Sequence, residues 1–529
     1  MNRSAGWSAA LLVLLGLLLH APGISRLALD GEEGRRAVPA REMIASGDYV
    51  RPTVWGRTYV NKPPLSFWTI AAVTGFDGPV TPVAARLPSL LATLLTALAL
   101  LAFGARHLSP RAGLIAGLLF LMMPTVFAKG CRAEIEPVFT LLVFGALALG
   151  WSGARGSTPA AVGAGLLLGA AGLSKGPPAW AFYGAGLGAL ALFERSRRPL
   201  LSGRALLAIG LGLLPPLLWF VALRARVDSE ALWGTWSEQM GGGAFHLDVY
   251  LGERVQFVLR VLGAFLPASL LAIAAAWSWR RGGRPLPPAA KLAAAVVLAG
   301  FLFFLVSPRA RSRYVYPLAP WTALIAAQLL AGAWRPGADA VAGGAVRWLR
   351  GIASALALLV AGAGTVHALV RPLGEFAIDA VGWALLAVLA ALGALGLAHP
   401  RLRAPGPALA LFFAVLALGR GFQLTQLASL ERTAAEEAAA AAGLDAVLPP
   451  GAVLHTSHWG RFNQLFHLSH PVRWVDDPAA ELEPGAFLFL PRRAFREGGA
   501  GKRSEWEVVH SYVEQDSERV FVILRRRAP

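Results

Sequence analysis

Cysteine is nearly absent from this chain of 529 residues, whose single cysteine is Cys131. An internal disulfide and a zinc site built from several cysteines are therefore excluded. Charged residues are scarce as well, at 15% of the chain against roughly 25% in an ordinary soluble domain. The sequence also lacks a glycine-rich phosphate-binding loop of the P-loop or dinucleotide type, which argues against a nucleotide-driven pump.

The chain is instead rich in apolar residues. They make up 56% of the chain, and the mean hydropathy is +0.54. Long runs such as Ala9–Leu19, Leu87–Phe103 and Ala205–Leu223 reach or approach the ~20 residues that cross the hydrocarbon core of a bilayer. The composition therefore predicts a polytopic membrane protein.

About thirteen transmembrane helices are predicted from such runs. The first follows Arg3 and is interpreted as a membrane anchor, because the many later spans argue against a cleaved signal peptide. The others are expected near residues 84–105, 112–128, 137–151, 159–174, 177–193, 203–223, 257–278, 289–306, 314–334, 350–370, 378–398 and 406–424.

The net charge of +18 lies mostly in short loops between the apolar runs. A nucleic-acid-binding protein instead gathers Lys and Arg on one exposed face, so nucleic acid is not expected as a partner. Arginines occupy alternate loops, for example Arg106 and Arg111, then Arg155, and later Arg280 and Arg281. Because Lys and Arg are retained on the cytoplasmic side, this alternation predicts a cytoplasmic N-terminus and an external C-terminus.

Two segments depart from the pattern of membrane spans. Residues 24–83 are expected to form an external first loop, with Leu65–Phe76 as a helix in the membrane interface. The predicted fold is an all-α polytopic membrane domain over residues 1–425, which includes this loop, followed by a small external α/β domain over residues 426–529. That domain is expected to contain a helix at Ala434–Leu444 and strands near 452–455, 472–475, 487–490, 508–513 and 519–524.

Charged residues in the predicted external loops mark candidate sites, because external cations oppose the orientation bias and charges beside an apolar bundle are costly. The first cluster contains Asp30, Glu32, Glu33, Arg35 and Arg36. Carboxylates beside arginines can supply a general base next to a phosphate-binding clamp. The alternative is the acidic start of a helix with paired side chains, which the spacing alone slightly favours.

Two further clusters combine a cation with neighbouring polar groups. Tyr59 and Lys62 precede a pair of prolines, and a lysine ammonium suits a lipid phosphate, although snorkelling to headgroups explains it equally well. Arg132, Glu134 and Glu136 lie at a predicted outer turn. A helix start accounts for Glu136, but not for the other two as well.

The fourth cluster joins Lys175 to Arg309, Arg311 and Arg313. Three arginines at every second position in a short external loop oppose the positive-inside tendency, and an anionic ligand explains them simply. The alternative is contact with anionic lipid headgroups. The four histidines of the C-terminal domain have no accompanying cysteine and no metal-site spacing, so a polar surface is expected there; they are His455, His458, His467 and His470.

With these clusters in place, the chain resembles the bacterial members of the protein O-mannosyltransferase and aminoarabinose (lipid A) transferase superfamily, the GT-C glycosyltransferases. The resemblance covers roughly residues 25–180 and is looser beyond. It implies the GT-C fold, with about thirteen helices, an external first loop and often a C-terminal soluble domain. It is carried by Glu32-Glu33-Gly-Arg35-Arg36, Arg41-Glu42-Met43, Ser46-Gly47-Asp48-Tyr49, Lys62-Pro63-Pro64-Leu65, Ala85-Arg86-Leu87-Pro88-Ser89, Arg132-Ala133-Glu134-Ile135-Glu136 and Ser174-Lys175-Gly176-Pro177.

The resemblance also implies roles for individual residues. The first-loop catalytic carboxylate of the family, usually Asp, matches Glu32, and Asp30 is the alternative base. The second family acid matches Glu136. In the lipid A branch a metal is held near a Glu-Lys and a Glu-His pair, where this chain has Asn61-Lys62 and Glu238-Gln239. The usual metal ligands of the family are therefore absent from these positions; no cofactor is expected to be required, and a divalent metal stays an alternative.

The resemblance and the clusters together predict an inverting membrane glycosyltransferase. Its donor would be a sugar on a polyprenyl phosphate, and its acceptor a glycolipid such as lipid A, a glycan or a protein, at the outer face of the bacterial inner membrane. The cations of the second and fourth clusters would bind the phosphate, and Glu32 or Asp30 would act as the base. A transporter or lipid flippase is the main alternative, and a binding or assembly subunit is the third.

Overall fold

Two compact units make up the chain. The membrane unit comprises Met1–Ile24, Arg86–Ala222 and Trp236–Leu430, and the mixed unit comprises Ser25–Ala85, Leu223–Thr235 and Glu431–Pro529. The computed structural model describes residues 3–22, 24–25, 27–195, 201–228, 247–281, 286–307, 311–335, 340–370, 378, 380–430, 434–458, 465–513 and 520–528.

Helices build the membrane unit, and each helix predicted from the sequence overlaps at least one of them. The all-α class predicted for this part of the chain is therefore confirmed. The helices are α1 (Arg3–His20), α4 (Pro82–His107), α5 (Pro110–Leu121), α6 (Pro124–Lys129), α7 (Ile135–Ala154), α8 (Thr158–Lys175), α9 (Pro178–Phe193), α11 (Gly203–Arg224), α13 (Leu247–Ala264), α14 (Ala268–Arg280), α15 (Pro288–Val306), η1 (Ser312–Leu318), α16 (Ala319–Ala331), η2 (Gly332–Trp334), α17 (Ala340–Val370), α18 (Ala380–Ala398), η3 (Pro400–Arg403) and α19 (Pro405–Leu430).

Hydropathy and length identify the spans among these helices. Within the described ranges, eight helices are long and apolar enough to cross a membrane, or nine if the bent pair α13 and α14 is one span. Ala5–His20, Pro110–Leu121 and Pro178–Phe193 are shorter apolar helices. The predicted multi-pass membrane character is confirmed.

Prolines divide three of the predicted helices. The expected helix at 112–128 is two helices, and Pro124 is the first residue of the second, α6. The expected helix at 257–278 bends by 98° between α13 and α14, where Pro267 precedes α14. The expected helix at 314–334 begins as the 3-10 helix η1, which contains Pro317. Proline lacks the backbone N–H that a helix interior needs, which is why each break lies beside one.

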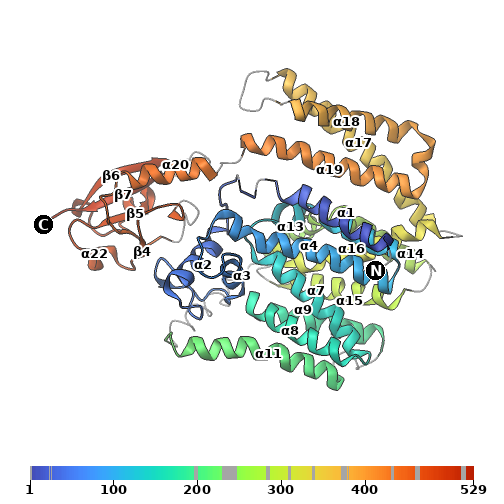
Figure 1. The fold of residues 1–529 in the computed structure, drawn as a ribbon, viewed down its shortest axis with the longest axis horizontal. Helices are drawn as coiled ribbons and strands as arrows, with labels where there is room; N and C mark the ends of the chain where they lie inside the picture. The colour runs from blue at the N-terminus through green and yellow to red at the C-terminus, as the bar shows by residue number, and fades with distance from the viewer. Residues whose placement is uncertain are drawn as a thin grey trace. The chain divides into compact units, whose positions relative to one another are not determined.

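Helix α16 lies at the centre of the membrane unit, and all its residues except Gln328 are buried. Its Trp321 is fully buried, with ring centroids 4.7 Å from Phe144 of α7 and 5.9 Å from Phe103 of α4. Helices α17, α18 and α19 pack against one another beside this core (Figure 1). Helix η1 packs against α7 and α16, and α7 packs against α8, so these elements are held by the buried helices.

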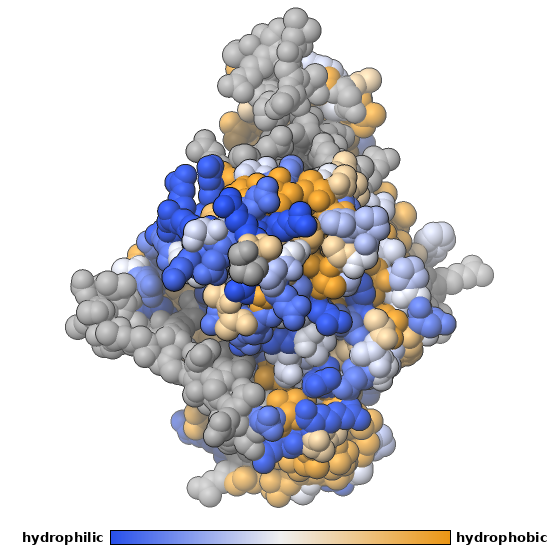
Figure 2. All heavy atoms as spheres, turned by 90° about the vertical axis from the view of Figure 1, so that its left-hand side faces the viewer, coloured by the Kyte–Doolittle hydropathy of each residue, from blue (hydrophilic) through white to orange (hydrophobic). Residues whose placement is uncertain are grey.

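The mixed unit contains the first loop and the C-terminal domain. The loop has helices α2 (Gly34–Ser46) and α3 (Leu65–Val73) and a hairpin of β1 (Thr53–Val54) and β2 (Arg57–Thr58). The predicted helix at Leu65–Phe76 is thus confirmed as a helix. In Figure 2, where the left-hand side of Figure 1 faces the viewer, hydrophilic side chains cover much of the centre of the view and are interrupted by hydrophobic patches.

The C-terminal domain is the small α/β domain that the sequence predicts. Its five-stranded sheet has the order β4-β3-β5-β7-β6, in which β3 is parallel to β4 and β5, and β7 is antiparallel to β5 and β6. Successive apolar residues of the central strands are buried, and Leu488 and Leu524 among them are fully buried. Its elements are α20 (Ala434–Asp445), β3 (Leu454–Thr456), β4 (Val472–Trp474), α22 (Pro478–Glu481), β5 (Phe487–Pro491), α23 (Arg492–Arg496), η4 (Arg503–Glu505), β6 (Trp506–Val513) and β7 (Val520–Arg526).

Candidate active site

A buried ion pair lies where helices α7 and α8 meet in the membrane unit. The Lys175 ammonium is 3.2 Å from the Glu136 carboxylate, and the two side chains are only 10% and 8% exposed. Glu136 lies in the first turn of α7, and Lys175 is the last residue of α8. Each charge therefore complements the dipole of its own helix. The structure brings together two candidate residues that are 39 positions apart in the sequence.

Aromatic rings and a further cation surround this ion pair. The Lys175 ammonium lies 5.2 Å from the ring centroid of Phe139 and 5.3 Å from that of Tyr314 in η1. The Arg313 guanidinium lies 5.7 Å from the same Tyr314 ring. Arg311 is exposed at the N-terminal end of η1, whereas Arg309 lies outside the described residues. Arg313 also interacts electrostatically with Glu136, so the positive charge at this site exceeds that of one lysine.

The turn before α7 carries the third cluster, and helix α4 holds it in place. Lys129 forms an ion pair with Glu134, while Arg132 is half-buried beside it. Ser89 of α4 donates a hydrogen bond to the Glu134 carbonyl oxygen at 3.1 Å, and Thr93 donates one to the Gly130 carbonyl oxygen at 2.8 Å. The backbone that presents Glu134 and Glu136 is therefore fixed from both ends.

Arg254 is a buried cation that the sequence reasoning missed. It belongs to α13 and donates a hydrogen bond to the Ser307 carbonyl oxygen at 2.7 Å, just after α15 ends. A cation at this position satisfies a helix-terminal carbonyl and complements the negative end of the dipole. The helices predicted near 203–223 and 257–278 leave Arg254 in a connecting loop, whereas α13 already starts at Leu247. An arginine beside an apolar helix is the signal that could have identified it.

The first cluster lies at the start of α2 in the mixed unit. Glu32 is 3.4 Å from the Arg36 guanidinium and 3.6 Å from that of Arg35. Glu33 is fully buried and accepts a hydrogen bond from the backbone N–H of Asp30 at 2.9 Å. Glu33 therefore fixes the turn that precedes α2. Glu32 is half-buried and Asp30 is exposed, so both carboxylates remain accessible to a substrate.

Arg36 connects the first cluster to the second. Its side chain is 6% exposed, and its guanidinium donates to the Tyr59 hydroxyl at 3.5 Å as well as to Glu32. Tyr59 packs against Phe67 of α3, with ring centroids 6.3 Å apart. Lys62 is half-buried in the turn that leads into α3. Carboxylate, guanidinium and phenol thus form one continuous polar group within the loop.

Glu42 organises the hairpin that follows α2. Its carboxylate accepts hydrogen bonds from the backbone N–H groups of Trp55 at 2.6 Å and Gly56 at 3.2 Å, and from the Thr53 hydroxyl. Trp55 and Gly56 have φ angles of 57° and 79°. Two left-handed residues in a row are what a tight two-residue hairpin requires, and the non-glycine one is strained. The charge-assisted bonds from Glu42 offset that strain.

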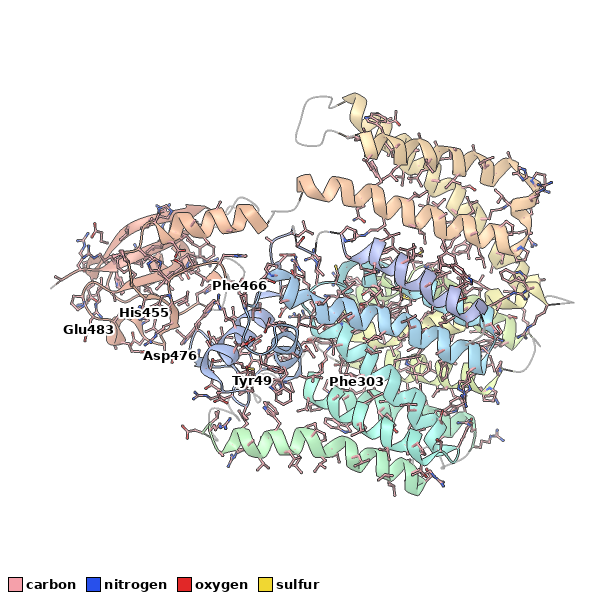
Figure 3. The ribbon with its side chains drawn as sticks, in the orientation of Figure 1. Tyr49, Phe303, His455, Phe466, Asp476 and Glu483 are labelled. Carbon is pink, nitrogen blue, oxygen red and sulfur yellow. The ribbon has the colours of Figure 1, made fainter. Side chains whose placement is uncertain are left out.

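The same loop is attached to the C-terminal domain, which the sequence did not predict. Arg41 donates a hydrogen bond to the Phe466 carbonyl oxygen at 2.7 Å, and its guanidinium lies 4.8 Å from the Phe466 ring centroid. The Trp474 backbone N–H donates to the Trp55 carbonyl oxygen at 2.7 Å. Figure 3 shows Phe466 and Asp476 on the side of the domain toward the first loop, and Asp476 is 3.4 Å from Arg57.

Replacing Arg41 with alanine is expected to lower the free energy of local opening at this attachment by roughly 1–3 kcal/mol, because the Phe466 carbonyl loses a charged donor. Hydrogen exchange of the Trp474 amide measures this directly, since that N–H bonds to Trp55. Arg51→Ala is the matched control, because Arg51 is an exposed arginine of the same loop that pairs with Asp48. Equal exchange rates in the two variants would contradict the role of Arg41.

The C-terminal histidines have separate surroundings. His455 Nδ1 is 3.2 Å from the Phe487 carbonyl oxygen. His470 contacts the Asp445 carboxylate through Nδ1 at 2.7 Å and the Pro449 carbonyl oxygen through Nε2 at 3.0 Å. Across the described residues there is no group of three or more His, Cys, Asp or Glu side chains that could hold a metal ion. Glu238 and Gln239 lie outside the described residues.

The His470–Asp445 pair predicts a pH-dependent stability of the mixed unit. The hydrogen bond to Asp445 raises the pKa of His470, against a smaller effect of burial. This stabilisation is complete below the unfolded pKa, near 6.5, and is lost as the pH rises through the folded pKa. Thermal unfolding is expected to shift down by roughly 2–4 °C between pH 6 and 8. His470→Asn should remove this slope, and His510→Asn is the control; an unchanged slope in His470→Asn contradicts the prediction.

Comparison with known proteins places the chain beside lipid-linked sugar transferases. A sequence profile described as dolichyl-phosphate-mannose-protein mannosyltransferase matches residues 61–220. An undecaprenyl phosphate-alpha-4-amino-4-deoxy-L-arabinose arabinosyl transferase of Sodalis glossinidius is 31% identical over 345 residues, which are 62% of this chain and 60% of the relative. The transferase of that name from Edwardsiella ictaluri is 34% identical over 170 residues, 32% and 30% of the two chains. The matches span less than two thirds of these relatives.

Solved structures share the fold of this chain. ArnT from Cupriavidus metallidurans in the apo state has a TM-score of 0.74 at 21% sequence identity, with 99% of this chain and 98% of that chain covered. The same protein bound to undecaprenyl phosphate has a TM-score of 0.71 at 21% identity, with 98% of each chain covered. This likeness shows that the chain has the same fold as ArnT.

Proposed function

Because the chain has the fold and the sequence motifs of the GT-C glycosyltransferases, which confirms the predicted resemblance, we propose that it transfers a sugar from a polyprenyl phosphate to an acceptor at the outer face of a bacterial inner membrane. An undecaprenyl phosphate donor is supported by the names of the relatives. A glycolipid is the favoured acceptor, with a glycan or a protein as alternatives. The N-terminus would then be cytoplasmic, and residues 426–529 would be external.

The observation that carries this proposal is the cationic site at one end of an apolar helix bundle. Lys175 and Glu136 are nearly buried there, and Arg313 and Tyr314 lie beside them. A charge pair at that depth is costly unless a ligand uses it. A lysine ammonium has three N–H donors, so Lys175 can hold Glu136 and still donate to a phosphate. Apolar helices beside the site suit a lipid tail.

The chemistry assigned to the loop is proton transfer from the acceptor. Glu32 would remove the proton from the acceptor hydroxyl or amine as that atom attacks the anomeric carbon. The bond between the anomeric carbon and the phosphate oxygen then breaks, and the configuration inverts. The leaving phosphate takes the negative charge, which Lys62, Arg311 and Arg313 would stabilise. Arg36 pairs with Glu32 and orients it. No metal or other cofactor is needed for this route.

A purified-protein assay tests the proposal. With an undecaprenyl-phosphate-linked sugar and a glycolipid acceptor, the protein is expected to release undecaprenyl phosphate and to give a glycosylated acceptor in equal amounts. A flippase would move the donor across a liposome membrane without breaking the glycosidic bond. Movement without release of undecaprenyl phosphate would therefore contradict the proposal.

A further inference from the structure

An apolar groove lies in the membrane unit along helices α1, α5 and α19, and it has a volume of about 430 Å³. Within the described part of the chain, Arg111 is the one charged side chain that lines it. Leu11 and Leu15 come from α1, Ile115 and Leu118 from α5, and Phe413 from α19, and all of them are apolar. The groove is therefore a hydrocarbon-like slot that carries a single positive charge.

The charge lies at one end of the groove. Arg111 is the second residue of α5, Gly406 is the second residue of α19, and Trp334 ends η2, so all three lie at helix ends. The lining continues along α19 from Gly406 to Ala417. At a rise of 1.5 Å per residue this is about 16 Å, close to half of the ~30 Å hydrocarbon core. The groove thus has the depth of one lipid leaflet.

We propose that this groove binds an anionic phospholipid, with an acyl chain along α5 and α19 and the phosphate at Arg111. The Arg111 guanidinium lies 5.6 Å from the ring centroid of Trp334. Stacking of this kind orients the guanidinium while its N–H groups stay available for a phosphate. Tryptophan also prefers the headgroup level of a bilayer. An arginine and a tryptophan at the mouth of a leaflet-deep apolar slot therefore match a phospholipid from headgroup to tail.

Charge and length favour an anionic phospholipid over other lipids. The lining residues provide no carboxylate that could pair with the ammonium of a zwitterionic headgroup, so Arg111 would repel that group. A polyprenyl tail is several times longer than a groove of one leaflet depth. The groove is also distinct from the candidate active site. Arg111 lies at the start of α5, whereas the turn at Lys129 follows the other end of α5, after α6. The inference consequently does not rest on the proposed function.

Lipid retention by the purified full-length protein tests the inference. Native mass spectrometry in mild detergent is expected to show one phosphatidylglycerol per chain, which phosphatidylcholine does not replace. Arg111→Gln should weaken phosphatidylglycerol binding about tenfold, as expected for the loss of charged hydrogen bonds. Ala414→Phe and Ala410→Phe introduce a large ring into the groove and should each abolish retention. Two separate filling variants ensure that one misfolded protein does not decide the result.

Arg281→Gln is the matched control. Arg281 also stacks on a tryptophan, 4.2 Å from the ring centroid of Trp277, directly after α14, but it does not line the groove. This control should retain phosphatidylglycerol as the unaltered protein does. Equal loss in Arg281→Gln and Arg111→Gln would overturn the inference. So would equal binding of phosphatidylcholine, or displacement of phosphatidylglycerol by equimolar undecaprenyl phosphate.

Discussion

Glu32→Gln is expected to lower the rate of sugar transfer roughly 10²–10⁴-fold, the contribution of a general base. The carboxylate is half-buried and is held by Arg36 at 3.4 Å, whereas a glutamine of the same shape cannot accept the proton. Donor binding should change little, because Glu32 does not carry the positive charge that holds the phosphate. The measurement is release of undecaprenyl phosphate over time, with donor affinity determined separately. A donor that binds much more weakly to Glu32→Gln would point to misfolding of the loop.

Asp30→Asn is the matched control for that experiment. It makes the same chemical change two residues away, at an exposed carboxylate, and should reduce the rate much less. Glu32→Asp, which restores the residue type usual in the family, should recover part of the activity. Full transfer by Glu32→Gln together with a large loss in Asp30→Asn would reassign the base to Asp30. Full transfer by both variants would remove the loop carboxylates from the mechanism.

Breaking the Lys175–Glu136 pair is expected to have the largest effect on stability. Lys175→Met removes the ion-pair partner of Glu136, and Glu136→Gln removes that of Lys175, so each should cost roughly 3–5 kcal/mol of unfolding free energy. The double variant should cost much less than the sum, since neutral side chains of similar size can fill the same space. Thermal unfolding of the three proteins in detergent gives this comparison. Additive losses would mean that the two charges do not interact.

Transfer measured on the same proteins separates a functional from a structural role of this pair. If Lys175 binds the phosphate, the double variant will be folded but will transfer poorly. Near-normal transfer by the double variant would make the pair purely structural. Arg155→Gln is the control, since the Arg155 side chain is 38% exposed and its partner Glu194 is half-buried, against 10% and 8% for Lys175 and Glu136. Surface ion pairs contribute about 0–1 kcal/mol, so this variant should unfold like the unaltered protein.

Local patterns predicted the elements well where one physical signal dominates. The five strands of the C-terminal domain overlap their predicted ranges, because short apolar runs such as those of β5 and β7, in which successive residues are buried, are typical of core strands. The helix at Leu65–Val73 follows two prolines, which place its start. The prolines also mark where the predicted helices were too long. Pro124 and Pro267 each lie at a break, and hydropathy averaged over a long window conceals such breaks.

Only part of the candidate active site could be predicted from the sequence. Glu136 and Lys175 stand out as charges beside apolar runs, but nothing local reveals that one pairs with the other across 39 residues. Glu33 stays a predicted substrate ligand, and only the structure shows that it is buried and accepts a hydrogen bond from the Asp30 backbone N–H. Arg254 was overlooked because its helix begins within a segment that hydropathy assigns to a loop. The sequence identifies the charged residues that lie beside apolar runs, whereas their interaction partners depend on how the helices pack.

The amino-acid sequence by itself determined that this protein is a polytopic membrane protein with a small C-terminal α/β domain, since hydropathy and periodicity act over a few neighbouring residues. The sequence also determined which charged residues lie beside apolar membrane-spanning runs, where a charge is energetically costly. Only the tertiary structure decided that Lys175 neutralises Glu136, that Arg41 attaches the first loop to Phe466, and that Arg111 lies at the mouth of an apolar groove. These contacts join residues far apart in the chain, and their energy depends on burial and distance, which exist only once the helices have packed.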